Sequence, residues 1–421
     1  MKSYRDQGQI LHFSYYLILY TVIFTIFTRL IGSLGLPRIF NHFHYILLIL
    51  NIFYYIYILK KSDQSLSIIF FWLNICLIVS SLINNVSKYN FIIDFLILFQ
   101  PLIIILILLG INFKEEEKKF IFKILILITI LNSFFVYVQY FYLGLRNDDV
   151  HGIFIDLGTA PHTAAGFNFI SSLLVFFYSD MNNFKKTLLL AFFLSVIILT
   201  STLTMFLSIL ITIGFMIIYK NKNFFKIVIY FSISFFGLII ILYLIKDTEI
   251  YKIRFSPEKF LIPYLDALVY KYKIFFFLNE NFLDIKNLLF GLGPGHSISR
   301  LSLMIPRYDY LLDFTSTRMS EIVFNIQQLN YYSNLYTGSS FFSLFFFSAG
   351  IYGDLGIIGF LLYYLFWFRL YLINKNNVLN KLIIVNILVL SFIFQWLEEP
   401  AFICYIALIL GVNFKKEKIE T

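Results

Sequence analysis

The feature that most constrains this chain is a series of uninterrupted apolar runs, each about twenty residues long, that recur almost from end to end. A helix of that length crosses the roughly 30 Å of hydrocarbon in a bilayer. Only 14% of the residues are charged and 60% are hydrophobic, whereas a soluble fold of this size needs a far more charged surface. The sequence therefore predicts an all-α polytopic membrane protein, surrounded by lipid over most of its length.

The apolar runs predict about twelve transmembrane helices. Two long runs are each interpreted as a hairpin. Residues 187–219 have a polar centre at 200–204, and residues 382–412 are split by Glu398, Glu399 and Pro400, which suit a turn better than mid-bilayer. The expected spans lie near 11–31, 43–59, 66–83, 91–112, 120–143, 164–179, 187–200, 203–219, 224–245, 354–373, 381–396 and 399–413.

The distribution of cations predicts the orientation of these spans, because Lys and Arg accumulate in cytoplasmic loops. With both termini in the cytoplasm, the inner loops and tails hold Lys2, Arg5, Lys60, Lys61, Lys114, Lys118, Lys119, Lys185, Lys186, Lys220, Lys222, Lys226, Lys375, Lys381, Lys415, Lys416 and Lys418. The short outer loops hold only Arg38, Lys88 and Arg146. We therefore expect a multi-pass protein of a cytoplasmic (inner) membrane.

The same topology divides the chain into three parts. Residues 1–245 form an N-terminal transmembrane bundle, and residues 341–421 form the C-terminal transmembrane helices with a short cytoplasmic tail. Between them, residues 246–340 form one large extracytoplasmic loop, which carries ten Lys and Arg residues: Lys246, Lys252, Arg254, Lys259, Lys271, Lys273, Lys286, Arg300, Arg307 and Arg318. Long loops are translocated regardless of charge, so the topology does not explain why cations gather here.

A glycine-rich segment within the long loop is the first candidate binding element. Gly291, Gly293 and Gly295 lead to His296. Closely spaced glycines let the backbone approach a ligand, and their amides can surround a phosphate. A plain structural turn explains the same pattern equally well. The segment is not a dinucleotide fingerprint, because no strand and helix of such a unit flank it.

Three arginines follow that segment closely. Arg300, Arg307 and Arg318 have guanidinium groups suited to bidentate capture of phosphate oxygens. A solvated face, or contact with anionic lipid headgroups, is the alternative reading. Glu321 lies three residues after Arg318, so on a helix the two side chains would be neighbours and would form an ion pair.

Other polar positions lie in or near the spans. The outer loop near residues 144–163 contains Arg146, His151 and His162 with several aspartates, but the spacing matches no metal signature. Asp94 lies inside the fourth span, where an ionisable group either faces an interior partner or reaches the headgroups from the outer end. The two cysteines lie in apolar runs, which argues against a disulfide framework or a cysteine metal site.

Three stretches carry a resemblance to a known family. His151-Gly-Ile-Phe154 leads to Ala160-Pro-His-Thr-Ala164 at a span start; Ile198-Leu-Thr-Ser-Thr202 ends a helix; and Leu289-Phe-Gly-Leu-Gly-Pro-Gly295 precedes the Gly350–Gly359 stretch entering a span. Over roughly residues 120–413 the chain resembles the O-antigen polymerase and O-antigen ligase superfamily, which comprises Wzy-type polysaccharide polymerases and lipid A ligases.

The chain departs from the pattern of that family at several positions. His151 and Thr202 stand where arginines are usual, and His162 stands where an asparagine is usual. The loss of the arginine at Thr202 removes one expected anion contact. Ser339 and Ser340 occupy the place where the ligases carry a histidine, which favours a polymerase over a ligase.

The resemblance implies a GT-C-like fold and a metal-independent glycosyltransferase that needs no cofactor. Such an enzyme transfers O-antigen, capsule or exopolysaccharide repeat units between polyprenyl-diphosphate carriers, such as undecaprenyl diphosphate, on the outer face of the membrane. The implied partners are the polyprenyl-diphosphate-linked oligosaccharide and the lipid bilayer, with a chain-length regulator and a flippase also expected from the family. No nucleic-acid partner is implied.

That chemistry requires a base for the acceptor hydroxyl and cations for the departing diphosphate. The expected catalytic bases are His296 and Glu321. The expected substrate-binding residues are Arg300, Arg307, Arg318, Arg254, Arg146, His151, Gly291, Gly293 and Gly295.

The main alternative from another class is a flippase or transporter for the same lipid-linked unit. Such proteins usually have two matching halves and short loops, whereas this sequence has no internal repeat and one dominant outer segment. A ligase-type transferase is the alternative within the family. A membrane-bound acyltransferase should carry a histidine in or near a span, and the span interiors lack one.

Overall fold

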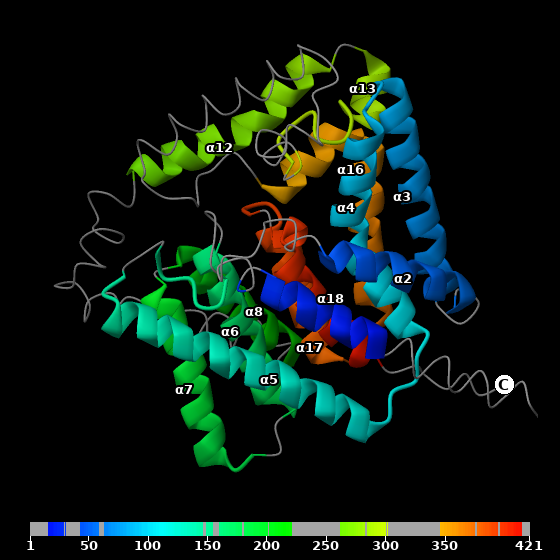
Figure 1. Ribbon diagram of the computed structural model, residues 1–421. Helices are drawn as coiled ribbons and strands as arrows, with labels where there is room; N and C mark the ends of the chain where they lie inside the picture. The colour runs from blue at the N-terminus through cyan, green and yellow to red at the C-terminus, as the bar shows by residue number, and fades with distance from the viewer. Residues whose placement is uncertain are drawn as a thin grey trace, which may run out of the picture.

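The computed structural model of the protein describes residues 16–28, 30, 43–58, 63–145, 149–154, 160–178, 181–200, 202–220, 262–282, 284–299, 301, 346–374, 377–394 and 396–414. Within these ranges the chain is helical and contains no strand (Figure 1). The all-α class expected from the apolar runs is therefore confirmed.

The described helices follow one another along the chain in this order. A first helix, Tyr16–Thr28, is followed by α2 (Phe43–Ile58), α3 (Gln64–Ile83), α4 (Lys88–Leu109), α5 (Glu115–Tyr137) with the π-helical turn η3 (Val138–Tyr142), α6 (Ala160–Tyr178), α7 (Asn183–Leu199), α8 (Leu203–Lys220), α12 (Ile262–Asn281), α13 (Ile285–Phe290), α16 (Phe347–Ile373), α17 (Val378–Leu390), the 3₁₀ turn η7 (Trp396–Glu398) and α18 (Pro400–Val412).

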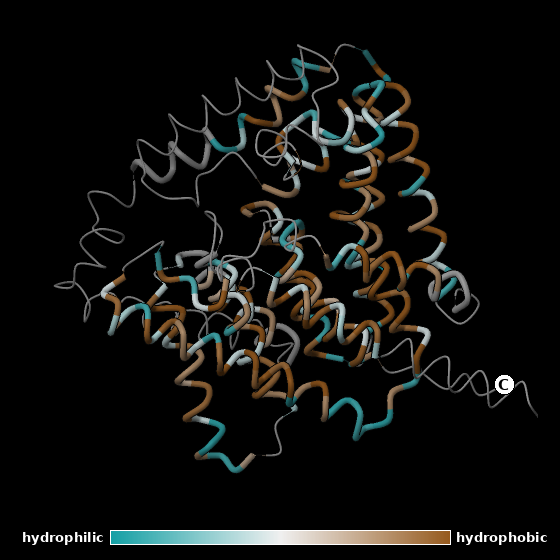
Figure 2. The backbone as a smooth tube through the Cα atoms, viewed as in Figure 1, coloured by the Kyte–Doolittle hydropathy of each residue, from teal (hydrophilic) through white to brown (hydrophobic). Residues whose placement is uncertain are grey.

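Four of the described helices are long and apolar enough to cross a membrane: α3, α4, α5 with η3, and α16. Shorter apolar helices, among them α17 and α18, accompany them. Figure 2 shows hydrophilic residues at the starts of α5 and α7 on one edge and around α13 on the opposite edge, with largely hydrophobic helices between. The protein is therefore a helical membrane-embedded protein.

Helix α4 lies at the centre of the packing. Its apolar window is 83% buried, against 33% for α3 and for α16, because α2, α3 and α18 all pack against it. A second group of helices, α5 to α7, packs together beside this centre (Figure 1). The side chains of α4 therefore mostly meet protein, and its polar residues need protein partners.

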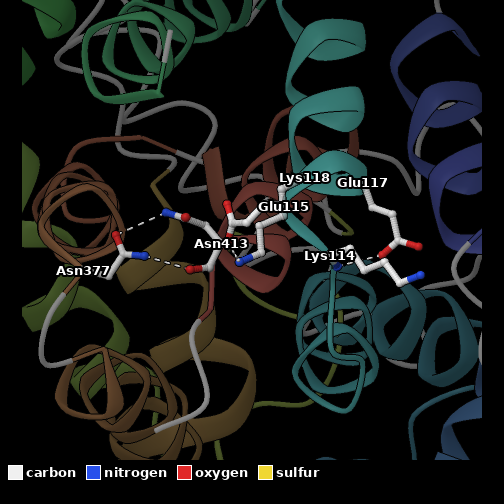
Figure 3. Close-up of polar contacts among 6 residues, drawn as sticks. All are labelled: Lys114, Glu115, Glu117, Lys118, Asn377 and Asn413. Atoms are coloured by element: carbon white, nitrogen blue, oxygen red, sulfur yellow. Dashed lines mark hydrogen bonds and ion pairs between the residues drawn. The ribbon is translucent and has the colours of Figure 1, made fainter. Parts of the chain in front are cut away.

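Helices α17 and α18 form the predicted hairpin. The amide Nδ2 of Asn413, after the end of α18, donates to Oδ1 of Asn377 at 3.1 Å and of Asn380 at 2.9 Å, both at the start of α17. Asn377 donates in return to the carbonyl of Asn413 at 2.8 Å (Figure 3). The start of one helix thus lies beside the end of the other, so the chain reverses between them.

The predicted break between α7 and α8 is also confirmed. Thr200 caps the end of α7, and its hydroxyl donates to the carbonyl of Val196 at 2.9 Å. Helix α8 starts three residues later, at Leu203. Helices occupy the expected positions of the spans throughout the described part, and the span expected at 224–245 lies outside it. The number of crossings, about twelve, stays a prediction.

The structure corrects the expected start of the span near residue 354. Helix α16 starts at Phe347, because the small residues Ser348, Ala349 and Gly350 are buried and allow close packing of its first turn. At Gly356 the backbone leaves the helical conformation, with φ 66° and ψ −167°. The glycine-rich first turns of α16 therefore form a kinked helix that is buried in the protein.

The expected extracytoplasmic loop also contains regular structure. Helix α12 runs along one edge of the molecule, and α13 follows it close to the end of α3 (Figure 1). Ile274 and Leu278 of α12 share a small apolar cluster with Leu292, Ile298 and Phe346. Thus α12 packs onto the glycine-rich segment and the start of α16. The predicted extent of this loop, 246–340, stays a prediction.

Candidate functional site

The carboxylate of Asp354, in the first half of α16, holds the glycine-rich segment in place. Its Oδ2 accepts the amide of Gly295 at 2.9 Å, and its Oδ1 accepts the amide of Ser297 at 3.0 Å and the hydroxyl of the same serine. The backbone carbonyl of Asp354 accepts the amide of Gly293 at 3.1 Å. A single residue therefore binds three positions of the segment.

Two glycines make this close approach possible. A side chain at Gly291, which has φ +79°, would place its Cβ 2.4 Å from the backbone of Asp354. A side chain at Gly356, with φ +66°, would place its Cβ 2.5 Å from the backbone nitrogen of Gly291. The backbone at Gly291 thus packs directly on the backbone of α16. Both glycines have a left-handed conformation, and neither has room for a side chain.

The end of α3 completes this arrangement. Asn84, the C-cap of α3, donates from Nδ2 to the carbonyl of Gly291 at 3.0 Å, and its Oδ1 accepts Nδ2 of Asn287 at 2.9 Å. The hydroxyl of Ser80 donates to the carbonyl of Asp354 at 2.8 Å. Helices α3, α13 and α16 therefore meet at the glycine-rich segment.

The sequence left open whether the glycine amides bind a phosphate or form a plain structural turn. In the structure the amides of Gly295 and Ser297 donate to the carboxylate of Asp354, and the amide of Gly293 donates to its backbone carbonyl. Backbone amides often bind anions, and two of these amides bind the protein's own carboxylate. Substrate contact by Gly291, Gly293 and Gly295 in another form stays a prediction.

His296, an expected catalytic base, lies in the middle of this segment and is fully buried. Its Nδ1 is 3.1 Å from the carbonyl of Leu292, and because a carbonyl can only accept, Nδ1 carries the proton. Burial lowers the pKa of His296, with this hydrogen bond opposing the shift. At neutral pH the ring is therefore neutral, with Nε2 as its basic nitrogen.

The connection between α17 and α18 is a second polar centre. Four successive carbonyls, those of residues 391–394, accept hydrogen bonds from other elements. Two donors come from α12: Nζ of Lys271 donates to Ile393 at 2.7 Å, and the hydroxyl of Tyr272 donates to Phe392 at 3.2 Å. Two come from the start of α16: the amide of Ser348 donates to Ser391 at 3.0 Å, and that of Phe347 donates to Phe394 at 3.1 Å.

Lys271 is fully buried at this contact. Its Nζ lies 5.1 Å from the ring centroid of Phe346 and 5.6 Å from that of Phe394, so two aromatic faces border the amine. Desolvation lowers the pKa of Lys271 to about 7. The sequence pointed to this residue only as one of ten cations in an outer loop, whereas the structure makes it the attachment of α12 to the helix connection.

Three carboxyl groups from α4, α16 and η7 are buried. Asp94 of α4, Asp354 of α16 and Glu398 of η7 are each 1% exposed. The alternative that Asp94 reaches the headgroups is therefore wrong, because its side chain points into the protein. The predicted turn at Glu398 and Glu399 exists, but both carboxyl groups are inside the protein.

The backbone of residues 151–153, in the predicted outer loop, is held by α5 and η3. Gln139, in the π-helical turn η3, accepts the amides of His151 at 3.0 Å and Gly152 at 2.7 Å, and its Nε2 lies 3.1 Å from Nδ1 of His151. Asn132 accepts the amide of Ile153 at 3.1 Å. The amide side chains of Asn132 on α5 and Gln139 in η3 thus hold the segment that leads to α6, and the sequence did not identify either residue.

His162 links this loop to the second polar centre. Its ring centroid lies 4.7 Å from that of Phe394, which also borders Lys271. The start of α6, the helix connection, α12 and the start of α16 therefore form one continuous set of contacts. In the described part of the chain, no group of three or more His, Cys, Asp or Glu side chains is arranged to hold a metal.

The remaining expected site residues lie outside the described residues. These are Glu321 and the five arginines Arg146, Arg254, Arg300, Arg307 and Arg318. Their roles stay predictions. The structure does locate the positions that border Arg300, since Ser299 and Leu301 on either side of it are both buried.

No protein-family model matches the chain, and no curated protein matches it.

The backbone contact at Gly291 yields a test with a matched control. We expect Gly291→Ala to lower the Tm of the purified protein strongly, because a left-handed alanine costs roughly 1–2 kcal/mol and the clash adds roughly 1–3 kcal/mol. Gly144→Ala is the control, because Gly144 has φ +69° but nothing within 4 Å of its added Cβ. Equal shifts in Tm for the two variants would contradict the backbone contact with Asp354.

The buried amine of Lys271 yields a pH test. The folded protein holds this proton only below a pH of about 7, whereas the unfolded chain holds it up to the ordinary pKa of 10.5. Unfolding between these values takes up a proton, so stability should rise with pH across this window. Thermal unfolding at several pH values should show that rise, and Lys271→Met should remove it. Lys273→Met, at an exposed position, should keep it; an unchanged rise in Lys271→Met would refute the assignment.

Proposed function

We propose that this protein is a polysaccharide polymerase of the cytoplasmic (inner) membrane. It transfers oligosaccharide repeat units of an O-antigen, capsule or exopolysaccharide between polyprenyl-diphosphate carriers on the outer face. It crosses the membrane about twelve times, with both termini in the cytoplasm. The enzyme is a glycosyltransferase whose donor is a lipid-diphosphate sugar.

This proposal rests on one observation: two of the stretches that carry the resemblance are in contact in the structure. Residues 289–295 and 350–359 are far apart in the chain, yet Asp354 and Gly291 bring them into direct backbone contact. The two stretches therefore form a single structural unit in this fold. That unit supports the resemblance, because a chance similarity would not require the two stretches to meet.

The arrangement of charge supports the proposed sidedness. The end of α3, the start of α4, α13 and the glycine-rich segment gather at one edge of the molecule (Figure 1). The start of α5, with Lys114 and Lys118, lies at the opposite edge, next to the α17–α18 hairpin ends (Figures 1 and 3). Since cations favour the cytoplasmic side, the glycine-rich unit faces outward.

The proposed reaction assigns a role to each group of candidate residues. A hydroxyl of one oligosaccharide attacks the anomeric carbon of the other, and the lipid diphosphate leaves with the bonding electrons. Arg300, Arg307 and Arg318, assisted by Arg254, Arg146 and His151, stabilise that anion. His296 or Glu321 accepts the proton of the attacking hydroxyl. For His296, the neutral ring with a basic Nε2 supports this role.

A carrier for the same lipid-linked unit is the second candidate function. The buried carboxyl groups of Asp94 and Glu398 favour it, because ionisable groups within membrane helices often mark proton pathways. The fixed union of α3, α13 and α16 favours the polymerase, since alternating access needs elements that move past one another. A ligase-type transferase would use the same carrier and differ in its acceptor.

A complementation assay tests the polymerase directly. In a strain that lacks its polymerase but supplies the matching repeat unit, the wild-type gene should restore a ladder of polymer lengths. Arg307→Ala, at unchanged protein level, should leave single repeat units on the final acceptor, because the departing diphosphate loses a charge partner. Lys286→Ala, which removes an equal charge from an exposed position of α13, should keep the ladder.

Unchanged ladders after alanine substitution at Arg300, Arg307, Arg318 and Arg254 in turn would remove the arginines from the mechanism. A wild-type protein that moves lipid-linked units across vesicle membranes without lengthening any glycan would favour the carrier.

A further inference from the structure

The side chain of Gln139 uses its full hydrogen-bonding capacity on the segment that contains His151. Its Oε1 accepts the backbone amides of His151 at 3.0 Å and of Gly152 at 2.7 Å, which occupies both lone pairs. Its Nε2 lies 3.0 Å from the carbonyl of Gly152 and 3.1 Å from Nδ1 of His151, which occupies both amide hydrogens. Because Gln139 is only 5% exposed, these contacts take the place of water.

These contacts determine which end of the Gln139 amide faces the histidine ring. A backbone N–H can only donate, so the atom that meets the amides of His151 and Gly152 is the oxygen. The atom that meets Nδ1 of His151 is therefore the nitrogen, which can only donate. Nδ1 is thus an acceptor and carries no proton. An imidazole ring in this contact is neutral, with its proton at Nε2.

The backbone on the other side of His151 is held equally closely. Oδ1 of Asn132, on α5, accepts the amide of Ile153 at 3.1 Å. Gly152 has φ +61°, and a side chain there would place its Cβ 2.1 Å from the same oxygen. Ile153 and Phe154 are fully buried. The ring of His151 therefore extends from a backbone that is anchored to α5 and η3, and it is itself only half-buried.

Gln139 lies in an unusual turn at the end of α5. In η3 the amide of Leu143 donates to the carbonyl of Val138 at 3.0 Å, and the amide of Leu145 then donates to the carbonyl of Gln139 at 3.0 Å. Such a π turn contains one residue more than a turn of α-helix, and π turns are frequent at functional sites. The contact between Gln139 and His151 thus occurs where the helix geometry is locally changed.

We propose that Gln139 is a positioning residue, which keeps His151 neutral and protonated at Nε2 so that this nitrogen donates to an oxygen of the lipid diphosphate. Nε2 is separated from Nδ1 by a ring carbon, so the donor lies on a different edge of the ring from the one that Gln139 binds. The position of the donor follows from the anchored backbone, and its proton follows from the amide of Gln139.

This inference rests on the proposed function, in which His151 contacts the departing diphosphate. As the acceptor oxygen bonds to the anomeric carbon, the bond from that carbon to the diphosphate breaks and the diphosphate keeps the electron pair. The hydroxyl proton goes to the base, His296 or Glu321. A fixed N–H directed at an oxygen stabilises the negative charge that develops there. His151 therefore acts as a directed hydrogen-bond donor and not as a substitute cation.

Nitrogen-15 NMR of the full-length protein in lipid bilayers tests the ring form without any substrate. With labelled histidine, the signals of His151 are those that His151→Asn removes. At neutral pH the wild type should be protonated at Nε2 and not at Nδ1. In Gln139→Glu, Nδ1 should become protonated, because a carboxylate can only accept. A wild-type ring protonated at Nδ1, or a ring form that Gln139→Glu leaves unchanged, overturns the proposal.

Asn132→Asp is the matched control for Gln139→Glu. It makes the same change from amide to acid in the same apolar helical run, but Asn132 binds this segment through the amide of Ile153 and not through the ring of His151. We expect the ring form of His151 to stay as in the wild type. A change equal to that in Gln139→Glu would show that any added acid alters the ring, and would overturn the specific role of Gln139.

Two substitutions at His151 test the role of the donor in the reaction. Glutamine can place an N–H near the position of Nε2, whereas the shorter asparagine reaches only as far as Nδ1. Both variants keep the backbone amide that binds Gln139. With purified lipid-linked units, the kcat of His151→Gln should exceed that of His151→Asn at least ~10-fold. Equal values overturn the role of the donor. A wild type that never elongates refutes the polymerase, while the NMR signals still decide the ring form.

Discussion

The hydrogen bonds around the carboxylate of Asp354 are the interaction on which the rest of the site depends. They join a glycine-rich segment to a helix that begins more than fifty residues later, with the amides of Gly295 and Ser297 as donors. Hydrogen bonds to a charged group are worth about 1.5–3 kcal/mol each, more than neutral ones. That strength offsets the burial of a carboxylate where the backbones of Gly291 and Gly356 touch.

A second constraint comes from the carbonyls of residues 391–394, which follow the end of α17. Backbone groups within a membrane protein must find partners inside the protein. The last carbonyls of α17 itself accept the amides of residues 391–394. The carbonyls of residues 391–394 accept from α12 and from the start of α16, and the amine of Lys271 is one of these donors. These hydrogen bonds attach α12 and the start of α16 to the connection between α17 and α18.

The helices were predictable from the sequence because a helix that crosses a bilayer needs an apolar run long enough to span the hydrocarbon. Apolar length locates α3, α4 and α5, and the polar breaks at 200–204 and 398–400 correctly divide two long runs. The site was only partly predictable. The glycines indicated that another group comes close to this backbone, but the sequence does not distinguish a ligand from another backbone segment. Asp354 and Lys271 have partners at sequence distances of 59 and 122 residues, so no local pattern identifies them.

We propose that the glycine-rich unit and α12 face the outside of the cell, and the proposed polymerase activity depends on this orientation. The most direct test labels an exposed cysteine with a thiol reagent that cannot cross membranes, since both native cysteines are buried. In intact cells, Glu280→Cys at the end of α12 should react at once. Glu116→Cys at the start of α5 should react only after the membrane is permeabilised. The reverse pattern would place the unit in the cytoplasm and contradict the account.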